Sequence, residues 1–329
     1  MRAVAVTAFP SEAELVELPK PDPAPGEVRV RVEYAALNPG DWQRADDPAA
    51  RSSSRGFPHV LGVDFAGRVD MIGRGPSRFR VGDPVFGRVA HPLPGGGAYA
   101  DYVSVHQDSP IAPVPTGLSL KAAAALPTAG TAACQILAAT GAGEGESLLI
   151  VGAAGGIGSY LTQLASARGV HVLAAVRGDE RRRMAILGAT RTLDVSAGPE
   201  SLLAAVRELY PHGVNALADL VSETPQAFAA HAALVREGGV VLTTRGATDG
   251  PGNPAQHGGP PPVDFRLAPS ALLLDALAAA VTSGAFVVPI DIELPLEKAP
   301  EALAQNRAGG ARGKTVFALG PSGAGHHHR

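Results

Sequence analysis

Residues 1 to about 120 carry short apolar runs that are separated by proline and glycine. Within residues 28–32, valine alternates with arginine, as expected for a strand with one buried and one exposed face. Such alternation is typical of antiparallel sheets, because one of their faces can meet solvent. We therefore predict an irregular, mostly antiparallel β region. Its other predicted strands are residues 1–6, 65–69, 84–89 and 98–105.

The pattern changes after residue 120. Residues 120–137 are rich in alanine and predict a helix that Pro127 and Gly130 interrupt. Apolar β-type runs then alternate with helical patterns, which predicts a doubly wound parallel sheet. The predicted strands are 148–151, 170–176, 190–194, 216–221 and 240–244, with helices at 157–168, 179–187, 199–209 and 225–236. A loop at 246–262, a helix at 267–283 and strands at 290–294 and 315–319 follow, and these last strands are predicted to return to the first region.

A glycine-rich turn joins the strand at 148–151 to the next helix. Gly155, Gly156 and Gly158 allow a tight turn and a close approach of a phosphate to the backbone. The free N–H groups and the positive dipole end of the helix face that turn. Ala153 takes the place of the first glycine of the usual dinucleotide fingerprint. Strand, turn, helix and second strand together predict a dinucleotide site; the alternative is a tight turn without a ligand.

Composition narrows the function classes. The chain has 329 residues, enough for two domains or one large one, and 45% of them are hydrophobic. A net charge of −3 predicts neither a nucleic-acid partner nor an anionic membrane. No apolar run approaches the roughly 20 residues that span a bilayer. A single cysteine, Cys134, excludes an intramolecular disulfide and predicts a cytoplasmic protein.

Residues 145–166 resemble the signature of the quinone oxidoreductase and zeta-crystallin branch of the medium-chain dehydrogenase/reductase superfamily. The matching positions are Gly145, Glu146, Leu149, the turn at 153–158, Gln163 and Ser166. Other segments resemble family motifs in the expected order up to about residue 319. They are Asn38-Pro39-Gly40-Asp41 and residues 61–67, 81–86, 97–102, 124–127 and 313–316.

This resemblance implies an α/β fold with two domains. A GroES-like, mostly antiparallel β catalytic domain is expected at residues 1–121 and 284–320, and a central Rossmann NADP(H)-binding domain, a doubly wound parallel sheet, at 122–283. Residues 321–329, with three histidines, are expected to form a disordered tail. The family also implies an active site in the cleft between the domains and a homodimer.

The cofactor is predicted to be NADPH. NAD enzymes place an acidic residue at the end of the second strand, where this chain has Ala175. Arg177 follows, and Arg181, Arg182 and Arg183 open the next helix, with guanidinium groups that suit a phosphate. A solvent-exposed helix face is the alternative for these arginines, and Glu180 departs from the lysine that the family often has near this position. The predicted cofactor-binding residues are Thr128, Ala154, Gly155, Gly156, Ile157, Gly158, Arg177, Arg181, Arg182 and Thr244.

The resemblance also implies residues on the substrate side. Asn38 is expected near the nicotinamide, where its amide can donate to a carbonyl; an ordinary turn is the alternative. Trp42 is expected to stack on a planar substrate or to pack in the core. Tyr99 is a candidate proton donor, which alternation along its strand would instead bury. Asp41 is expected to hold its loop rather than to act as a base.

No zinc is predicted. In zinc-dependent relatives, a cysteine falls within residues 38–41 and a His-Glu pair falls at Val63 and Asp64 of this chain. Cys134 lies away from both positions, and a catalytic zinc needs three protein ligands.

These features predict an NADPH-dependent, zinc-independent reductase. It would transfer a hydride to a quinone or an α,β-unsaturated carbonyl compound, the acceptor being a quinone, an enone or an enoyl thioester. A polyketide-type enoyl reductase is one alternative. A non-enzymatic NADPH-binding protein, crystallin-like or RNA-binding, is another.

Overall fold

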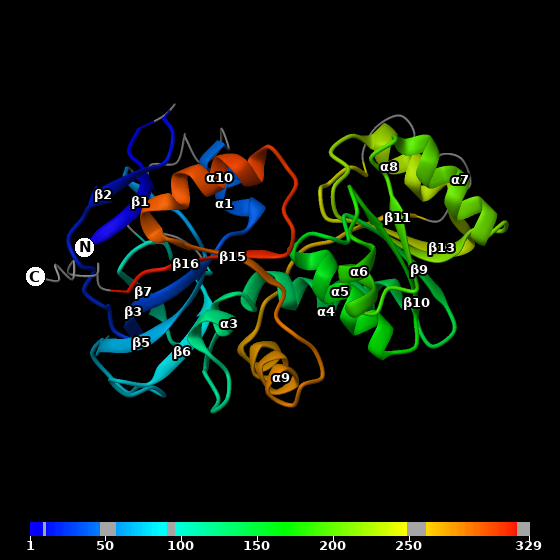
Figure 1. The fold of residues 1–329 in the computed structure, drawn as a ribbon. Helices are drawn as coiled ribbons and strands as arrows, with labels where there is room; N and C mark the ends of the chain where they lie inside the picture. The colour runs from blue at the N-terminus through cyan, green and yellow to red at the C-terminus, as the bar shows by residue number, and fades with distance from the viewer. Residues whose placement is uncertain (9–10, 47–56, 91–95, 249–260, 321–329) are drawn as a thin grey trace, which may run out of the picture. The chain divides into compact units, whose positions relative to one another are not determined.

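The computed structural model describes residues 1–8, 11–46, 57–90, 96–248 and 261–320. The predicted tail at 321–329 lies outside the described residues. The chain forms two compact units (Figure 1). Unit 1 comprises Met1–Thr131, Pro269–Gly310 and the chain from Lys314 onward, and unit 2 comprises Ala132–Ala268 and Ala311–Gly313.

Unit 1 contains the predicted antiparallel β region. Its larger sheet runs in the order β15-β16-β3-β5-β6-β8, and β7 pairs with β3. A smaller sheet runs β2-β1-β4. All of these pairings are antiparallel except that of β15 with β16. The strands are β1 (Arg2–Val6), β2 (Glu14–Glu17), β3 (Glu27–Ala36), β4 (His59–Val60), β5 (Asp64–Ile72), β6 (Pro84–Arg88), β7 (Tyr102–His106), β8 (Ile111–Pro113), β15 (Ile290–Pro295) and β16 (Lys314–Ala318).

Strand β3 shows how the alternating pattern is realised. Val28, Val30 and Val32 are buried in the core, as their spacing predicts. Arg31 is exposed, but Arg29 is buried because Asp70 on the neighbouring β5 accepts its guanidinium N–H at 2.8 Å. A buried charge needs such a partner, so the alternation breaks where the neighbouring strand supplies one.

Two helices of unit 1 were not predicted. They are α1 (Pro39–Asp46) and α10 (Ala299–Arg307), and each has proline in its first turn. Proline at the first helical position costs no hydrogen bond, because that N–H has no partner within the helix. The predicted strand at 98–105 begins only at Tyr102, since the preceding residues bond to the loop at Leu61 and Gly62.

Unit 2 is a Rossmann-like parallel sheet. Its order is β11-β10-β9-β12-β13-β14, and every pairing is parallel. Right-handed crossovers place α5 and α6 on one face and α7 and α8 on the other, as Figure 1 shows. The elements are α4 (Pro127–Thr140, which begins in unit 1), β9 (Ser147–Val151), α5 (Gly156–Ala167), β10 (His171–Val176), α6 (Arg181–Ile186), β11 (Arg191–Asp194), α7 (Pro199–Leu209), β12 (Val214–Asp219), α8 (Pro225–Ala232), β13 (Val235–Thr243) and β14 (Val263–Asp264).

Several boundaries differ from the predicted ones. Two helices, α3 (Leu120–Ala124) and α4, replace the interrupted helix, and α9 (Ala271–Thr282) starts after Ser270, whose side chain accepts the Leu273 N–H. Helix α9 belongs to unit 1, where Leu277 lies against Gly130: an added Cβ on that glycine would be 3.2 Å from its Cδ1. The compact units therefore do not share the boundaries of the predicted domains. Across the described ranges, no helix is both long enough and apolar enough to cross a membrane.

Candidate functional site

The glycine turn of unit 2 connects β9 to α5. Gly152 takes a φ of +87°, which glycine tolerates, whereas Ala153 needs no positive φ. This explains why alanine can replace the first glycine of the fingerprint. Gly155 caps α5 in an extended conformation, so the first N–H groups of the helix face the turn.

Gly155 and Gly158 serve different purposes. An added Cβ on Gly158 would lie 2.5 Å from the Ala153 Cα and the Gly152 carbonyl oxygen, so this glycine lets the helix pack on the strand. Among the described residues, an added Cβ on Gly155 would meet only the Gly152 oxygen, at 3.5 Å, and would otherwise face open space. Open space beside free N–H groups at a helix start fits a pyrophosphate.

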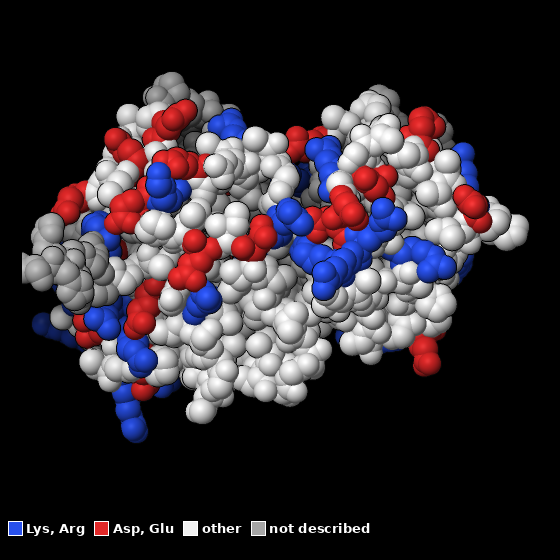
Figure 2. All heavy atoms as spheres, in the orientation of Figure 1, with Lys and Arg blue, Asp and Glu red and all other residues white. Residues whose placement is uncertain are grey.

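Charged side chains surround this turn. Arg183 donates from Nη2 to the Ala154 carbonyl oxygen at 2.9 Å and from Nη1 to Ser159 Oγ at 3.2 Å. Its Nε donates to Glu180 at 2.6 Å, and Arg312 binds the other oxygen of the same carboxylate. Figure 2 shows basic side chains interleaved with acidic ones over the part of unit 2 where α6 lies. Arg183 is thus the arginine of its helix that reaches the turn.

The other predicted arginines lie farther out. Arg177 follows β10 directly and is exposed, and its guanidinium has no partner among the described residues. Arg181 forms an exposed ion pair with Asp179 at 3.3 Å, and Arg182 is exposed. Thr244 follows β13, where its N–H donates to the Asp219 carbonyl at 3.2 Å. Arg312 lies outside the nucleotide-binding motif, so its position near the turn could not be read from the local sequence.

Asp219 orders the loop that covers Gly152. Its Oδ1 accepts the N–H groups of Val221 and Ser222 at 3.0 and 2.9 Å, and His231 Nδ1 lies 2.8 Å from its Oδ2. Burial opposes ionisation, but the hydrogen bonds from His231, Ser222 and Val221 outweigh it and hold the pKa of Asp219 below its usual value. The carboxylate is therefore charged in the folded protein.

This lowered pKa predicts how stability depends on acid. A carboxyl whose pKa is lower in the folded state stabilises above its unfolded pKa of about 3.8, and this contribution is lost as pH falls through the folded value. We expect Asp219→Asn to lower the free energy of unfolding at pH 7 and to differ less from the wild type below pH ~3.8. Urea unfolding of the wild type and of Asp219→Asn, from pH 7 to below pH ~3.8, measures the difference in free energy of unfolding. A difference that grows in acid would contradict the assignment.

Unit 1 holds a buried polar network. Lys314 Nζ donates to Asn38 Oδ1 at 2.7 Å and to the Leu37 carbonyl oxygen at 2.6 Å. Asn38 Nδ2 donates to Asp64 at 2.9 Å, and the Thr128 hydroxyl donates to the same carboxylate at 2.6 Å. Burial lowers the pKa of Lys314, while the charges of Asp64 and Asp41 oppose that shift.

The network determines the orientation of Asn38. An ammonium only donates and a carboxylate only accepts, so Lys314 faces the amide oxygen and Asp64 faces the amide nitrogen. The amide nitrogen also lies 3.4 Å from the Ala36 carbonyl oxygen. Asn38 is 5% exposed, so the geometry favours a role in ordering the loop over donation to a substrate.

Asp41 and Tyr99 stabilise the same loop. Asp41 accepts the Asn38 N–H at 2.9 Å, which caps the start of α1, and it accepts the Tyr99 hydroxyl at 2.7 Å. Tyr99 has no exposed surface and packs edge-on against Phe317. With its hydroxyl buried and bound, Tyr99 does not reach solvent in this structure, which favours the buried alternative over the proton-donor role.

Two further predicted residues bind protein groups. The Trp42 indole N–H donates to Asn306 on α10 at 3.0 Å, and Arg307 lies 5.8 Å from its ring. These contacts favour packing of α1 on α10 over substrate stacking. Thr128 lies in the first turn of α4, where its hydroxyl also accepts the Arg88 Nε–H at 3.1 Å.

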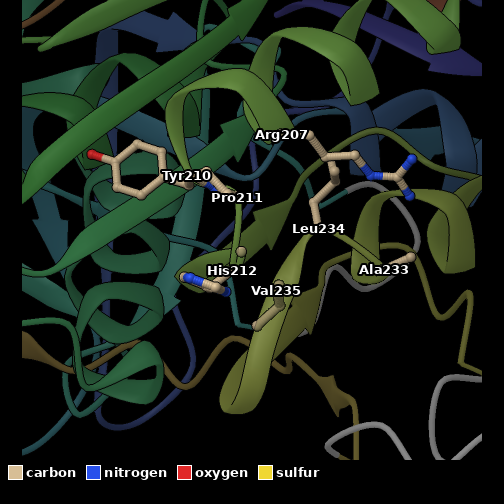
Figure 3. Close-up of a pocket in the computed structure, with 8 residues that line it drawn as sticks. Arg207, Tyr210, Pro211, His212, Ala233, Leu234 and Val235 are labelled. Carbon is tan, nitrogen blue, oxygen red and sulfur yellow. The ribbon is translucent and has the colours of Figure 1, made fainter.

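A small pocket lies at the opposite end of the parallel sheet from the glycine turn. It has a volume of about 160 Å³ and is lined by Arg207, Tyr210 and His212 and by residues that precede or open β12 and β13 (Figure 3). Ligands of doubly wound sheets bind at the carboxyl ends of the strands, so this pocket is not the nucleotide site.

Two segments of the chain match known protein families. Residues 24–116 match the alcohol dehydrogenase GroES-like domain, and residues 187–317 match the zinc-binding dehydrogenase family. A GroES-like β unit and a Rossmann-like unit with a glycine turn define the class of medium-chain dehydrogenases/reductases.

Individual relatives narrow this class. A chloroplast envelope quinone oxidoreductase homolog of Arabidopsis thaliana is 30% identical over 92% of this chain and 93% of its own length. A 2-methylene-furan-3-one reductase of Solanum lycopersicum is 29% identical over 90% of this chain and 73% of that protein. With a chloroplastic quinone-oxidoreductase homolog of Spinacia oleracea, identity is 35%, but the match spans only 54% of this chain and 55% of that protein. The chain belongs to the quinone oxidoreductase branch of the medium-chain dehydrogenase/reductase superfamily and is an oxidoreductase by descent.

Solved structures agree with this assignment. The quinone oxidoreductase from Coxiella burnetii superposes with a TM-score of 0.87 at 27% identity, over 97% of this chain and 99% of that one. A mycobacterial protein solved in complex with NADPH gives a TM-score of 0.81 at 27% identity, over 97% of this chain and 100% of that one.

A catalytic zinc does not fit the residues at the position expected for one. Zinc sites use Cys, His and carboxylate ligands, whereas Asn38, Asp64 and the Lys314 ammonium meet here. Both oxygens of Asp64 already accept hydrogen bonds from Asn38 and Thr128. Within the described ranges, no cluster of three or more His, Cys, Asp or Glu could hold a metal ion.

Proposed function

We propose that this protein is an NADPH-dependent, zinc-independent reductase of quinones or α,β-unsaturated carbonyl compounds. The observation that carries the nucleotide part is the turn at Gly155, which opens to the free N–H groups of α5 with arginines nearby. The end of β10 has Ala175 and Arg177 in place of an acid, which supports NADPH over NADH. The relatives named above support the acceptor class.

Bound NADPH would supply the hydride that adds to the electron-poor carbon of the acceptor. In unit 2, the start of α5 would bind the pyrophosphate, and Arg177 would bind the 2′-phosphate. In unit 1, Asn38, Asp64 and Thr128 order the starts of α1 and α4. An enoyl thioester remains the main alternative acceptor, since the same hydride addition serves both. The homodimer and the cytoplasmic location remain predictions.

Oxidation of NADPH at 340 nm tests this function. We expect turnover with members of a panel that contains 9,10-phenanthrenequinone, 1,4-benzoquinone, 2-alkenals and a crotonyl thioester, with NADH assayed in parallel. Turnover that persists with a chelator supports zinc independence, and the best acceptor separates quinone from enoyl chemistry. Tight NADPH binding without turnover of any acceptor would favour a non-enzymatic protein.

The cofactor preference has its own test. Arg177→Ala should raise the Kd for NADPH about tenfold to hundredfold, because a charged hydrogen bond to the phosphate is lost. NADH, which lacks that phosphate, should bind with unchanged affinity. Fluorescence titration of both cofactors measures this. An equal loss for NADH and NADPH would contradict recognition of the 2′-phosphate by Arg177.

A further inference from the structure

Glu180 lies at a position where a carboxylate would be expected to repel a phosphate. Its side chain is only 5% exposed, and each of its oxygens meets a different guanidinium group. Oε2 accepts the Arg183 Nε–H at 2.6 Å, and Oε1 contacts Arg312 Nε. Two positive charges and one negative charge leave the cluster with a net charge of +1. A buried carboxylate is tolerated because it is paired in this way.

The second guanidinium comes from a distant part of the chain. Residues 311–313 belong to unit 2, although the chain on both sides of them belongs to unit 1. The Gly313 N–H donates to the Ala154 carbonyl oxygen at 2.8 Å, and Gly313 forms a β-bridge with Gly155. The same carbonyl oxygen accepts Arg183 Nη2 at 2.9 Å. Arg312 is therefore anchored to the glycine turn through its neighbour and through Glu180.

We propose that Glu180 is a positioning residue that holds Arg183 and Arg312 beside the glycine turn, and that Arg312 is a ligand for the phosphate groups of the cofactor. Arg312 suits this role because its side chain is 57% exposed while Glu180 holds its Nε. Because Glu180 fixes the Nε end of the guanidinium, the two terminal NH₂ groups are held in one orientation. A guanidinium group that is already oriented loses less conformational freedom when it binds a phosphate. The inference rests on the proposed NADPH function.

The direction in which Glu180→Gln changes the affinity for NADPH distinguishes a residue that positions the arginines from one that repels phosphate. If Glu180 only repelled phosphate, Glu180→Gln would tighten NADPH binding. If it positions the arginines, the same change weakens binding, because a neutral amide holds two guanidinium groups less well than a carboxylate. We expect Glu180→Gln and Arg312→Ala each to raise the Kd for NADPH about tenfold. In the double variant, the Kd for NADPH should rise by less than the product of the two single fold-changes.

Calorimetric titration with NADPH, NADH, 2′,5′-ADP and ADP measures these effects without turnover. A loss in Arg312→Ala confined to NADPH and 2′,5′-ADP assigns Arg312 to the 2′-phosphate. A loss shared by all four ligands assigns it to the 5′-phosphate on the adenosine, and a loss confined to NADPH, NADH and ADP assigns it to the second phosphate of the pyrophosphate. Arg191→Ala is the matched control, because Arg191 opens β11 at the amino end of the parallel sheet. In the part of the chain that the structure describes, its guanidinium bonds only the Thr190 carbonyl oxygen. Circular dichroism checks that each variant is folded.

Unchanged NADPH affinity in Arg312→Ala, or tighter binding by Glu180→Gln, would overturn this inference while leaving the proposed function intact. A wild-type protein that binds none of the four ligands would instead overturn the proposed function, and this inference with it.

Discussion

Gly158→Ala should abolish measurable NADPH binding and lower the free energy of unfolding by about 1–3 kcal/mol. The added methyl group would lie 2.5 Å from the Ala153 Cα and the Gly152 carbonyl oxygen, which are backbone atoms and cannot rotate away. The start of α5 must then move off β9, and the N–H groups that face the turn move with it. Fluorescence titration of NADPH and urea unfolding measure the two effects.

Gly143→Ala is the matched control for this substitution. Gly143 precedes the amino end of β9, and an added Cβ there would meet only Glu146 Oε2 at 3.9 Å. The control should therefore keep its NADPH affinity and its stability. Normal NADPH binding by Gly158→Ala would show that the pyrophosphate does not bind at this turn.

Asp64→Ala should destabilise unit 1 by about 3–5 kcal/mol, the usual cost of removing one partner from a buried charged cluster. The substitution leaves the Asn38 amide and the Thr128 hydroxyl without their shared acceptor. It also removes a negative charge that favours the buried Lys314 ammonium. Urea unfolding followed by circular dichroism measures the loss.

Two comparisons make this prediction specific. Asp108→Ala, at a carboxylate whose side chain is 80% exposed, should change stability by less than ~0.5 kcal/mol. The double variant Asp64→Asn/Lys314→Met should lose less free energy of unfolding than the sum of the losses in the two single variants, because it removes both charges together. Additive losses would show that the two residues do not stabilise one another.

Much of the fold could be predicted because it depends on local patterns. The alternation of strands and helices after residue 140 predicted the parallel sheet, and β9, α5 and β10 lie within a few residues of their expected positions. Boundaries were less accurate where packing decides them: the helix expected to reach residue 236 ends at Ala232, since β13 begins at Val235. Helices α1 and α10 were missed because proline near their starts reads as a turn.

The candidate site was predictable only in part. The glycine turn was correctly placed at the carboxyl end of a parallel strand, because its spacing and its flanking elements are local. The choice among Arg181, Arg182 and Arg183 depends on which side of α6 faces the turn, and that became clear only from the contact of Arg183 with Ala154. The substrate-side residues were named by resemblance, and their partners were not foreseen.

By itself, the sequence determined the alternation of elements, the glycine turn after β9 and the lack of an acid at the end of β10, since each is a property of neighbouring residues. Only the tertiary structure decided that Lys314 lies beside Asn38 and that Arg312 meets Glu180. These pairs are separated by 276 and, in the second case, by more than a hundred residues. No local pattern records such contacts, because the cost of burying each charge is offset only when the folded chain brings its partner within hydrogen-bonding distance.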